Sequence, residues 1–426
     1  MTRSSIRDRL VDLATVLIAL RALSAPLAVP LLGMLALAGS IATEPRSLVD
    51  FYRTNKAITI CLAGVILFSL VNALEYHYRP VYYGLLAVST VLIGHHIAKS
   101  GKALPLASIL YFSYLVILAI CAVMFGASPE DINTYFPNVS RNGVSAAAIF
   151  LQIFYSTAYF REKKEAPLIT PVITLLICIL CYGRSGSGFG FALLIASCAQ
   201  VIIGKRSFIQ PLIALVIGSA LMAYALAGPQ ISAAIRSVMA SRPAPVIVTQ
   251  PAPSVGSKPA AKSTVAPAST PPLTTRAPVA PPPAQTAYSG WSRAGLQSVR
   301  WRMASEYVSA LDLKAVVLGG ALTASPAIVA HNMNPHNSFI RGHAYFGIAY
   351  LVLIATVFFS ALRRMKGGDI FLVTLLGIYA GRAFFDAFSL FDCLDFVFFF
   401  TAFSISPPKH QPQEEIAGQV PLGVAA

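Results

Sequence analysis

Long runs of apolar residues recur along the whole chain, and they limit its possible folds more than any other feature. Each run holds about 17 to 25 residues, enough to cross roughly 30 Å of hydrocarbon as a helix. With 56% hydrophobic and 12% charged residues, the chain carries more apolar surface than a soluble core of this size can bury. The sequence therefore predicts an all-α polytopic membrane protein.

Twelve transmembrane helices are expected from these runs. Nine lie within residues 1–228 and three within 344–405, and residues 406–426 form a cytoplasmic tail. Arg21 interrupts the first run, which leads into further runs and not into a cleavage site, so we expect no cleaved signal peptide. The expected helices cover approximately residues 10–23, 26–42, 57–74, 80–98, 103–125, 142–160, 166–182, 187–203, 207–228, 344–362, 369–386 and 391–405.

Lysine and arginine are distributed unevenly between the connections of these helices. With the N-terminus in the cytoplasm, every cytoplasmic connection carries basic residues, as the positive-inside rule requires. Topology thus explains the formal charge of +15, and we expect no nucleic acid partner. We predict a multi-pass protein of the bacterial inner membrane with the loop 229–343 in the periplasm. The basic residues concerned are Arg3, Arg7, Arg9, Arg46, Arg53, Lys56, Lys99, Lys102, Arg161, Lys163, Lys164, Lys205, Arg206, Arg363, Arg364 and Lys366.

The loop 229–343 has three parts. Residues 229–242 form a short amphipathic stretch. Residues 243–285 hold twelve prolines and no acidic residue, which indicates a disordered or extended insertion that cannot bury a core and serves as a spacer or tether. Residues 286–343 regain tryptophan, tyrosine and helical spacing, so we expect this part to be ordered and to carry functional residues.

The loop ends in the sequence H-N-M-N-P-H-N-S-F-I-R-G-H, from His331 to His343. Histidine exchanges a proton near neutral pH and can activate a hydroxyl nucleophile. His336 is therefore a candidate catalytic base, although a structural hydrogen bond is the simpler role for a single histidine at a membrane boundary. His336 precedes Asn337 at the expected start of a helix, and a continuous helix would bring His343 to the same face two turns later.

Neither a metal nor another cofactor is expected. The three histidines fit no compact zinc pattern and have no carboxylate between them. Cys178 and Cys181 lie within an expected membrane helix without a second pair, which favours packing over metal binding.

The segment C-Y-G-R-S-G-S-G-F-G, residues 181–190, joins two expected helices on the periplasmic side. Glycines let backbone amides approach a ligand, and arginine binds phosphate in a forked geometry. Arg184 and Ser185 are therefore candidate ligands of a pyrophosphate. Close helix packing by the small residues, with Arg184 at the membrane interface, explains the segment equally well.

Further polar residues are expected at the same surface. Arg300 and Arg302 lie in the ordered part of the loop, where no acidic residue occurs between positions 231 and 305. Their side chains are candidates to bind phosphate, and a solvated helix face or a contact with anionic lipid headgroups explains them equally well. The substrate-binding residues that we predict are Arg302, Asn337, Arg341, His343, Ser185, Asn138 and Arg141.

The order of these features resembles that of the O-antigen ligase and polysaccharide polymerase family, over about residues 130–355. The similar elements are G-R-S-G at 183–186, the long late loop, an arginine-led helix at Arg300 with a later glycine pair at 319–320, and P-H-N-S-F-I at 335–340. In the family a tryptophan follows the loop arginine by about four residues. That place here holds Ala304, while Trp301 adjoins Arg300, so Arg300 and Arg302 both stay candidates.

The resemblance implies a glycosyltransferase-C-like helical fold and a periplasmic glycosyltransferase that is metal-independent and inverting. The donor would be a glycan on undecaprenyl pyrophosphate, and the acceptor a hydroxyl of a lipid or glycan. Arg184 and Arg300 would neutralise the pyrophosphate, and His336 would orient or deprotonate the acceptor. Ligation of O-antigen and polymerisation of O-antigen or exopolysaccharide both fit, with other polysaccharide assembly proteins as partners.

Two other functions are compatible with the membrane helices. A transporter or flippase of lipid-linked polysaccharide precursors should carry ionisable residues near the bilayer midplane and is often built from two related halves. The expected helices have few such residues, and no repeat is evident. A scaffold that uses the proline-rich arm would leave His336 and Arg184 without a role.

Overall fold

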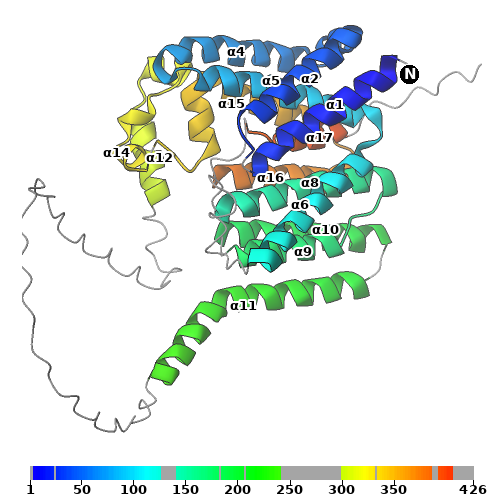
Figure 1. Cartoon of the computed structure of the whole chain (residues 1–426), viewed down its shortest axis with the longest axis vertical. Helices are drawn as coiled ribbons and strands as arrows, with labels where there is room; N and C mark the ends of the chain where they lie inside the picture. Colours follow the sequence, from blue (N-terminus) through cyan, green and yellow to red (C-terminus); the bar gives the residue numbers. More distant parts are fainter. Residues whose placement is uncertain are drawn as a thin grey trace, which may run out of the picture. The chain divides into compact units, whose positions relative to one another are not determined.

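The computed structural model describes residues 3–23, 25–125, 141–181, 184–205, 208–240, 299–331, 333–385 and 392–405. Within these residues every regular element is a helix and none is a strand, in agreement with the all-α prediction. The chain divides into two compact parts, residues 1–225 with 297–426, and residues 226–296. The described residues of the second part are 226–240, the last turns of the helix Ile209–Ala240. The helical bundle described in the following paragraphs belongs to the first part (Figure 1).

The elements follow one another in this order: α1 Arg3–Ala19, the 3₁₀ helix η1 Leu20–Leu23, α2 Ala28–Thr43, α3 Arg46–Thr54, α4 Lys56–Tyr76, α5 Arg79–Ser100, α6 Ala103–Phe125, α8 Arg141–Lys163, α9 Ile169–Leu180, α10 Arg184–Lys205, α11 Ile209–Ala240, α12 Val299–Ser309, α13 Leu313–Leu318, η3 Leu322–Ala324, α14 Pro326–Ala330, α15 Ser338–Arg364, η4 Gly367–Asp369, α16 Ile370–Phe384 and α17 Phe396–Ser404.

Seven of the described helices are long and apolar enough to cross a membrane, or eight if the bent pair α2 and α3 counts as one. They are α4, α5, α6, α8, α10, α15 and α16. Their outward faces expose large apolar side chains, such as Leu74 at 91%, which suits contact with lipid. The structure is thus consistent with a helical membrane protein. The count of twelve, the periplasmic loop and the inner-membrane orientation stay predictions.

The short helix α17 forms the centre of the bundle, and all its residues from Phe396 to Ser404 are buried. α5 and α8 pack against it. Gly94 of α5 permits this approach, because a Cβ there would lie 2.7 Å from the backbone nitrogen of Phe400. The hydroxyls of Thr157 and Thr401 pair at 3.1 Å between α8 and α17, as polar groups in a dry interior require.

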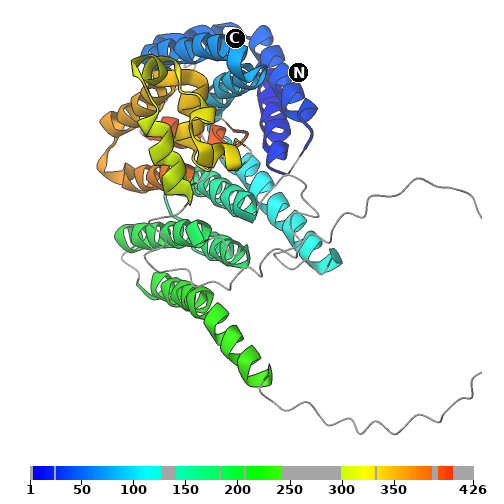
Figure 2. The ribbon, with the colours of Figure 1, turned by 90° about the vertical axis from the view of Figure 1, so that its left-hand side faces the viewer.

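The bundle has two ends that differ in charge. At the basic end, where α5, α8 and α15 finish, Arg161 of α8 reaches the Ser404 hydroxyl at 3.4 Å, and Arg364 of α15 reaches the Ala402 carbonyl at 3.1 Å. Lys99 lies in the last turn of α5. At the opposite end, which we call the site end, α5, α8 and α15 begin. The loop helices α12 to α14, drawn in yellow, lie in front of the bundle in the view of Figure 2.

Candidate functional site

The start of α15 is defined by a polar cap. The helix begins at Ser338, next to the start expected at Asn337 and six residues before the predicted membrane span at 344. The side-chain oxygen of Asn337 accepts hydrogen bonds from the backbone N–H groups of Phe339 at 2.8 Å and Ile340 at 3.1 Å, which satisfies the first turn. His336 precedes the cap with a φ of +48° and lies outside the helix. The helical face that it was expected to share with His343 is therefore not formed.

His343 lies inside the loop–helix contact. Its Nε2 is 3.0 Å from the Val316 carbonyl oxygen and its Nδ1 is 2.8 Å from the Tyr307 hydroxyl. A carbonyl only accepts, so Nε2 carries the proton and Nδ1 accepts from Tyr307. Burial raises the pKa of the Tyr307 phenol and keeps it protonated as the donor. Both ring nitrogens are used to join α12, α13 and α15, which is a structural role, and the substrate-binding role of His343 stays a prediction.

The glycines of the loop and of α15 serve a close backbone approach. α15 is kinked at Gly347, which has a φ of +57°, and a Cβ there would lie 2.1 Å from the Val317 carbonyl oxygen. Gly319 has a φ of +107° and sits against the carbonyls of α15. Asn72 of α4 donates to the carbonyls of Leu318 at 2.7 Å and Tyr345 at 2.9 Å. The ordered part of the loop is thus fixed to the bundle at the kink.

Arg302 is directed away from the bundle core. Its side chain is 66% exposed and pairs with Glu306 at 3.1 Å, one turn along α12. Glu306 in turn accepts from the Ala327 N–H at 2.9 Å and the Ser325 hydroxyl at 2.8 Å. These hydrogen bonds lower the pKa of Glu306 and hold α12 to α14. Arg302 therefore supports a loop contact.

Arg300 reaches the other way, toward the bundle. Its Nη1 donates to the Phe385 carbonyl at 2.9 Å, just after the end of α16. The Phe385 ring packs on Phe189 of α10 with centroids 5.9 Å apart. Through Phe385 the start of α12 meets the first turns of α10, the helix that begins at Arg184. The structure thus brings the backbone of Arg184 and the side chain of Arg300 to one corner of the site end.

The glycine-rich start of α10 packs tightly on α8. A Cβ at Gly186 would lie 2.7 Å from the Ser145 hydroxyl, so this glycine serves helix packing. Ser185 is half-buried in the same turn. The side chains of Arg184 and Arg141, and the whole of Asn138, lie outside the described part of the chain. Their predicted roles stay predictions.

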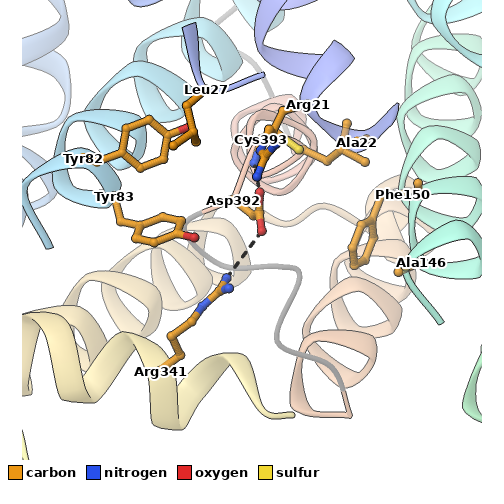
Figure 3. A pocket seen from close by; sticks show the side chains of 13 residues that line it. Arg21, Ala22, Leu27, Tyr82, Tyr83, Ala146, Phe150, Arg341, Asp392 and Cys393 are labelled. Atoms are coloured by element: carbon orange, nitrogen blue, oxygen red, sulfur yellow. Dashed lines mark hydrogen bonds and ion pairs between the residues drawn. The ribbon is translucent and has the colours of Figure 1, made fainter. Parts of the chain in front are cut away.

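A cavity of about 130 Å³ opens at the site end (Figure 3). Two arginines from distant parts of the chain line it, Arg21 in η1 and Arg341 in the first turns of α15. In the view of Figure 3 the carboxylate of Asp392 lies between them. The other residues that line the cavity are Ala22, Leu27, Tyr82, Tyr83, Gly143, Ala146, Ala147, Phe150, Cys393 and Leu394.

Arg341 is held in the cavity by a long ion pair and an aromatic ring. Its Nη2 lies 3.5 Å from the nearer Asp392 oxygen, and its carbon CZ lies 5.2 Å from the centre of the Tyr83 ring. The buried Nη2 makes no hydrogen bond with any residue that the structure describes. A buried N–H without an acceptor is unfavourable, so a bound anion that accepts from it would be stabilised.

Asp392 belongs to a turn that precedes α17. Its carboxylate accepts from the Cys393 N–H at 2.7 Å, and its own N–H donates to Asp395. Asp395 is fully buried and accepts from the Tyr379 hydroxyl at 2.7 Å. The turn therefore holds Asp392 in a fixed position beside Arg341.

Charges of both signs lie at the cavity. Two guanidinium groups face one carboxylate, and residues from the first turns of α5, α8 and α15 form part of its wall. The start of a helix carries a partial positive charge and unsatisfied N–H groups, which favour anions. Forked guanidinium groups add directed hydrogen bonds to phosphate or carboxylate oxygens. The site therefore suits an anion with several oxygens.

Sequence reasoning selected Arg341 but missed Arg21, Tyr83 and Asp392 as cavity residues. Two signals were present. Arg21 interrupts the first apolar run at its far end, and a basic residue at the expected periplasmic surface requires an explanation under the positive-inside rule. Asp392 and Asp395 lie in a mostly apolar segment, where an ionisable residue marks a candidate functional site.

A third arginine, which sequence reasoning missed as it did Arg21, is buried at the same end. Arg382 of α16 is fully buried, and its Nη2 donates to the Asn142 carbonyl at 3.0 Å. It therefore joins the end of α16 to the start of α8 and adds positive charge behind the site.

Among the described residues no group of three or more histidine, cysteine, aspartate or glutamate side chains could hold a metal. The rings of His331 and His336 lie edge to face with centroids 6.3 Å apart. Nδ1 of His331 is 2.9 Å from the Ala327 carbonyl oxygen, which ties that ring to its own helix.

No model of a protein family, no curated protein and no solved structure matches this chain. Fold and site together define an all-helical protein with candidate membrane-spanning helices and an arginine-lined cavity at one end of its bundle.

Proposed function

We propose that this chain is an inner-membrane glycosyltransferase of the O-antigen ligase and polysaccharide polymerase type, with its cavity facing the periplasm. It transfers a glycan from undecaprenyl pyrophosphate to an acceptor hydroxyl. The observation that carries the proposal is the convergence of Arg21 and Arg341 on one cavity. Arg341 belongs to the P-H-N-S-F-I-R element, whose place in the chain resembles that of the family.

The pyrophosphate leaving group accounts for the charge of the cavity. Arg341 offers its guanidinium to a phosphate oxygen, and Arg21 adds a second cation. Asp392 sits 3.5 Å from Arg341, too far for a good hydrogen bond, so an anion can take over this contact. Arg300 and Arg184 are further candidates for the second phosphate. Positive charge placed where leaving-group charge develops is often the largest contribution to catalysis.

His336 acts on the acceptor in this mechanism. The neutral imidazole takes the proton of the acceptor hydroxyl, whose oxygen forms a bond to the anomeric carbon of the donor. The bond from that carbon to the pyrophosphate oxygen breaks, and its electron pair leaves with undecaprenyl pyrophosphate. Attack from the face opposite the leaving group inverts the anomeric centre.

The fate of the lipid-linked glycan in cells that lack the protein tests this function. Single repeat units held on undecaprenyl pyrophosphate would indicate a polymerase, and long chains held on that lipid would indicate a ligase. A plasmid copy of the wild-type chain or of Lys314→Gln, an exposed residue of α13, should restore the product, whereas Arg341→Gln should not. A glycan profile that is unchanged without the protein would contradict the proposal.

The transporter alternative gives a different result in the same cells. Loss of a flippase would leave the lipid-linked units on the cytoplasmic leaflet, where a glycosidase added to spheroplasts cannot reach them. Our proposal requires them to accumulate on the periplasmic leaflet, accessible to that enzyme.

A further inference from the structure

A second cavity, of about 320 Å³, lies at the basic end of the bundle, far along α1 and α5 from the site described above. We infer that this basic-end cavity binds the headgroup of a zwitterionic phospholipid with a primary ammonium group, such as phosphatidylethanolamine. The inference is independent of the proposed function and concerns a different surface.

The helix α3 covers this cavity and has the form of a membrane-surface helix. It is bent by 96° from α2, so it runs across the direction of the membrane-spanning helices. Leu48, Val49 and Tyr52 lie on one side of it, with Tyr52 50% exposed, and Arg46 and Arg53 lie along the edge of that side. Such an amphipathic helix lies at the level of the lipid headgroups.

Phe51 fixes α3 to the bundle. Its buried ring packs edge to face on His95 of α5 at 5.0 Å and on Phe403 of α17 at 6.4 Å between centroids. The cavity beneath α3 is therefore built from rigid elements. A volume of about 320 Å³ admits a group much larger than water, for which ~10–15 Å³ suffices.

The cavity wall is amphiphilic. On α1, α2 and α5 the apolar lining residues Val11, Leu37 and Leu92 lie farther from the basic end and form an apolar side, whereas polar residues such as Arg7, Glu44 and Lys99 lie nearer to it. A small polar metabolite gains nothing from the apolar side. A phospholipid places its glycerol and first methylene groups there and its headgroup on the polar side.

The positive and negative charges of the wall balance, which favours a headgroup that itself carries one positive and one negative charge. Arg7 pairs with both Glu44 and Asp8, and Asp8 lies 3.3 Å from Nε2 of His96. Lys99 is exposed on the rim and makes no hydrogen bond or ion pair with the described residues. A phosphate accepts from Lys99, and an ammonium donates to Glu44 and Asp50, which face the same cavity.

Lipid titrations of the purified full-length protein test the inference, with native mass spectrometry as the readout. The probes are dioctanoyl phosphatidylethanolamine, dioctanoyl phosphatidylglycerol and free phosphoethanolamine. Lys99→Gln should bind phosphatidylethanolamine at least about tenfold more weakly, as loss of a charge-assisted hydrogen bond implies. The control Arg53→Gln, on α3 and not in the cavity wall, should bind like the wild type.

Glu44→Gln separates headgroup recognition from simple attraction to phosphate. It should reduce the preference for phosphatidylethanolamine over phosphatidylglycerol, because the ammonium loses one of its two carboxylate partners. Equal binding by wild type and Lys99→Gln, or equal binding of both lipids by the wild type, would overturn the inference. Binding of free phosphoethanolamine as tightly as the lipid would also overturn it and indicate a soluble phosphate ester instead.

Discussion

Two histidines of one short sequence element have different environments, and this difference separates a structural role from a chemical one. His343 uses both ring nitrogens, on the Tyr307 hydroxyl and the Val316 carbonyl. His336 stands before the N-cap of α15 in a left-handed turn and is half-exposed at the site end. The structural residue His343 can therefore be compared with His336, the proposed base, within the same sequence element.

His336→Ala should abolish glycan transfer while leaving the protein abundant in the membrane, because removal of a general base costs about 10²–10⁴-fold in rate. The control is His331→Ala, an exposed neighbour in the same element, which should keep transfer near wild type. The amount of transferred glycan in complemented cells is the measurement. Normal product from His336→Ala would remove this residue from the mechanism.

Tyr307→Phe should lower the free energy of unfolding by about 1–3 kcal/mol, the cost of leaving buried partners without their hydrogen bonds. The partners are the Gly320 N–H at 3.2 Å and Nδ1 of His343 at 2.8 Å. Unfolding of the purified protein in detergent gives the value, and Tyr224→Phe, whose side chain is 70% exposed, is the control. Equal effects of both changes would contradict the structural role given to His343.

At the scale of elements, the kink of α15 determines how the loop joins the bundle. The kink at Gly347 interrupts the hydrogen bonding of α15. The side-chain amide of Asn72 in α4 stabilises this arrangement, because it donates hydrogen bonds to the carbonyl oxygens of Tyr345 in α15 and Leu318 in α13. α13 then fits against the kinked turn. Arg341 lies before the kink and so belongs to the short first segment of α15, whose direction the kink sets. Loop position and cavity geometry therefore depend on the same glycine.

Gly347→Ala should detach the loop and reduce both stability and transfer, because the new Cβ would overlap the Val317 carbonyl and the positive φ is strained for alanine. Gly377→Ala in α16, where nothing lies within 4 Å of the new Cβ, should be tolerated. Limited proteolysis of the segment 299–337 reports the difference. A Gly347→Ala protein as resistant as Gly377→Ala would show that the kink is dispensable.

At the scale of the whole molecule, the two ends of the bundle should face opposite sides of the membrane. Positive-inside bias assigns the basic end to the cytoplasm. A Lys314→Cys protein should react with a membrane-impermeant maleimide in intact spheroplasts, whereas Arg53→Cys should react only after lysis. The wild type, with its own six cysteines, gives the background. The reverse labelling pattern would place the site end in the cytoplasm and contradict the proposed function.

The helical architecture could be read from the sequence because backbone groups in lipid must be satisfied within helices. The start of α15 could also be read, because Asn337 lies at the expected start of a helix and is its N-cap, whereas the kink at Gly347 could not, because it depends on the approach of α13. Arg341 was found through its sequence element. Arg21 and Asp392 were missed as its partners, because their proximity arises only when η1, α15 and the turn before α17 meet in the folded bundle.

The most direct test is the reaction of the purified protein with an undecaprenyl-pyrophosphate-linked glycan and an acceptor. The account predicts that one undecaprenyl pyrophosphate is released for each glycan transferred. Arg341→Gln should lower this rate by about 10²–10³-fold, and Lys314→Gln should not. Failure of the wild type to release the lipid pyrophosphate with its matched acceptor, or an Arg341→Gln rate equal to that of the wild type, would contradict it.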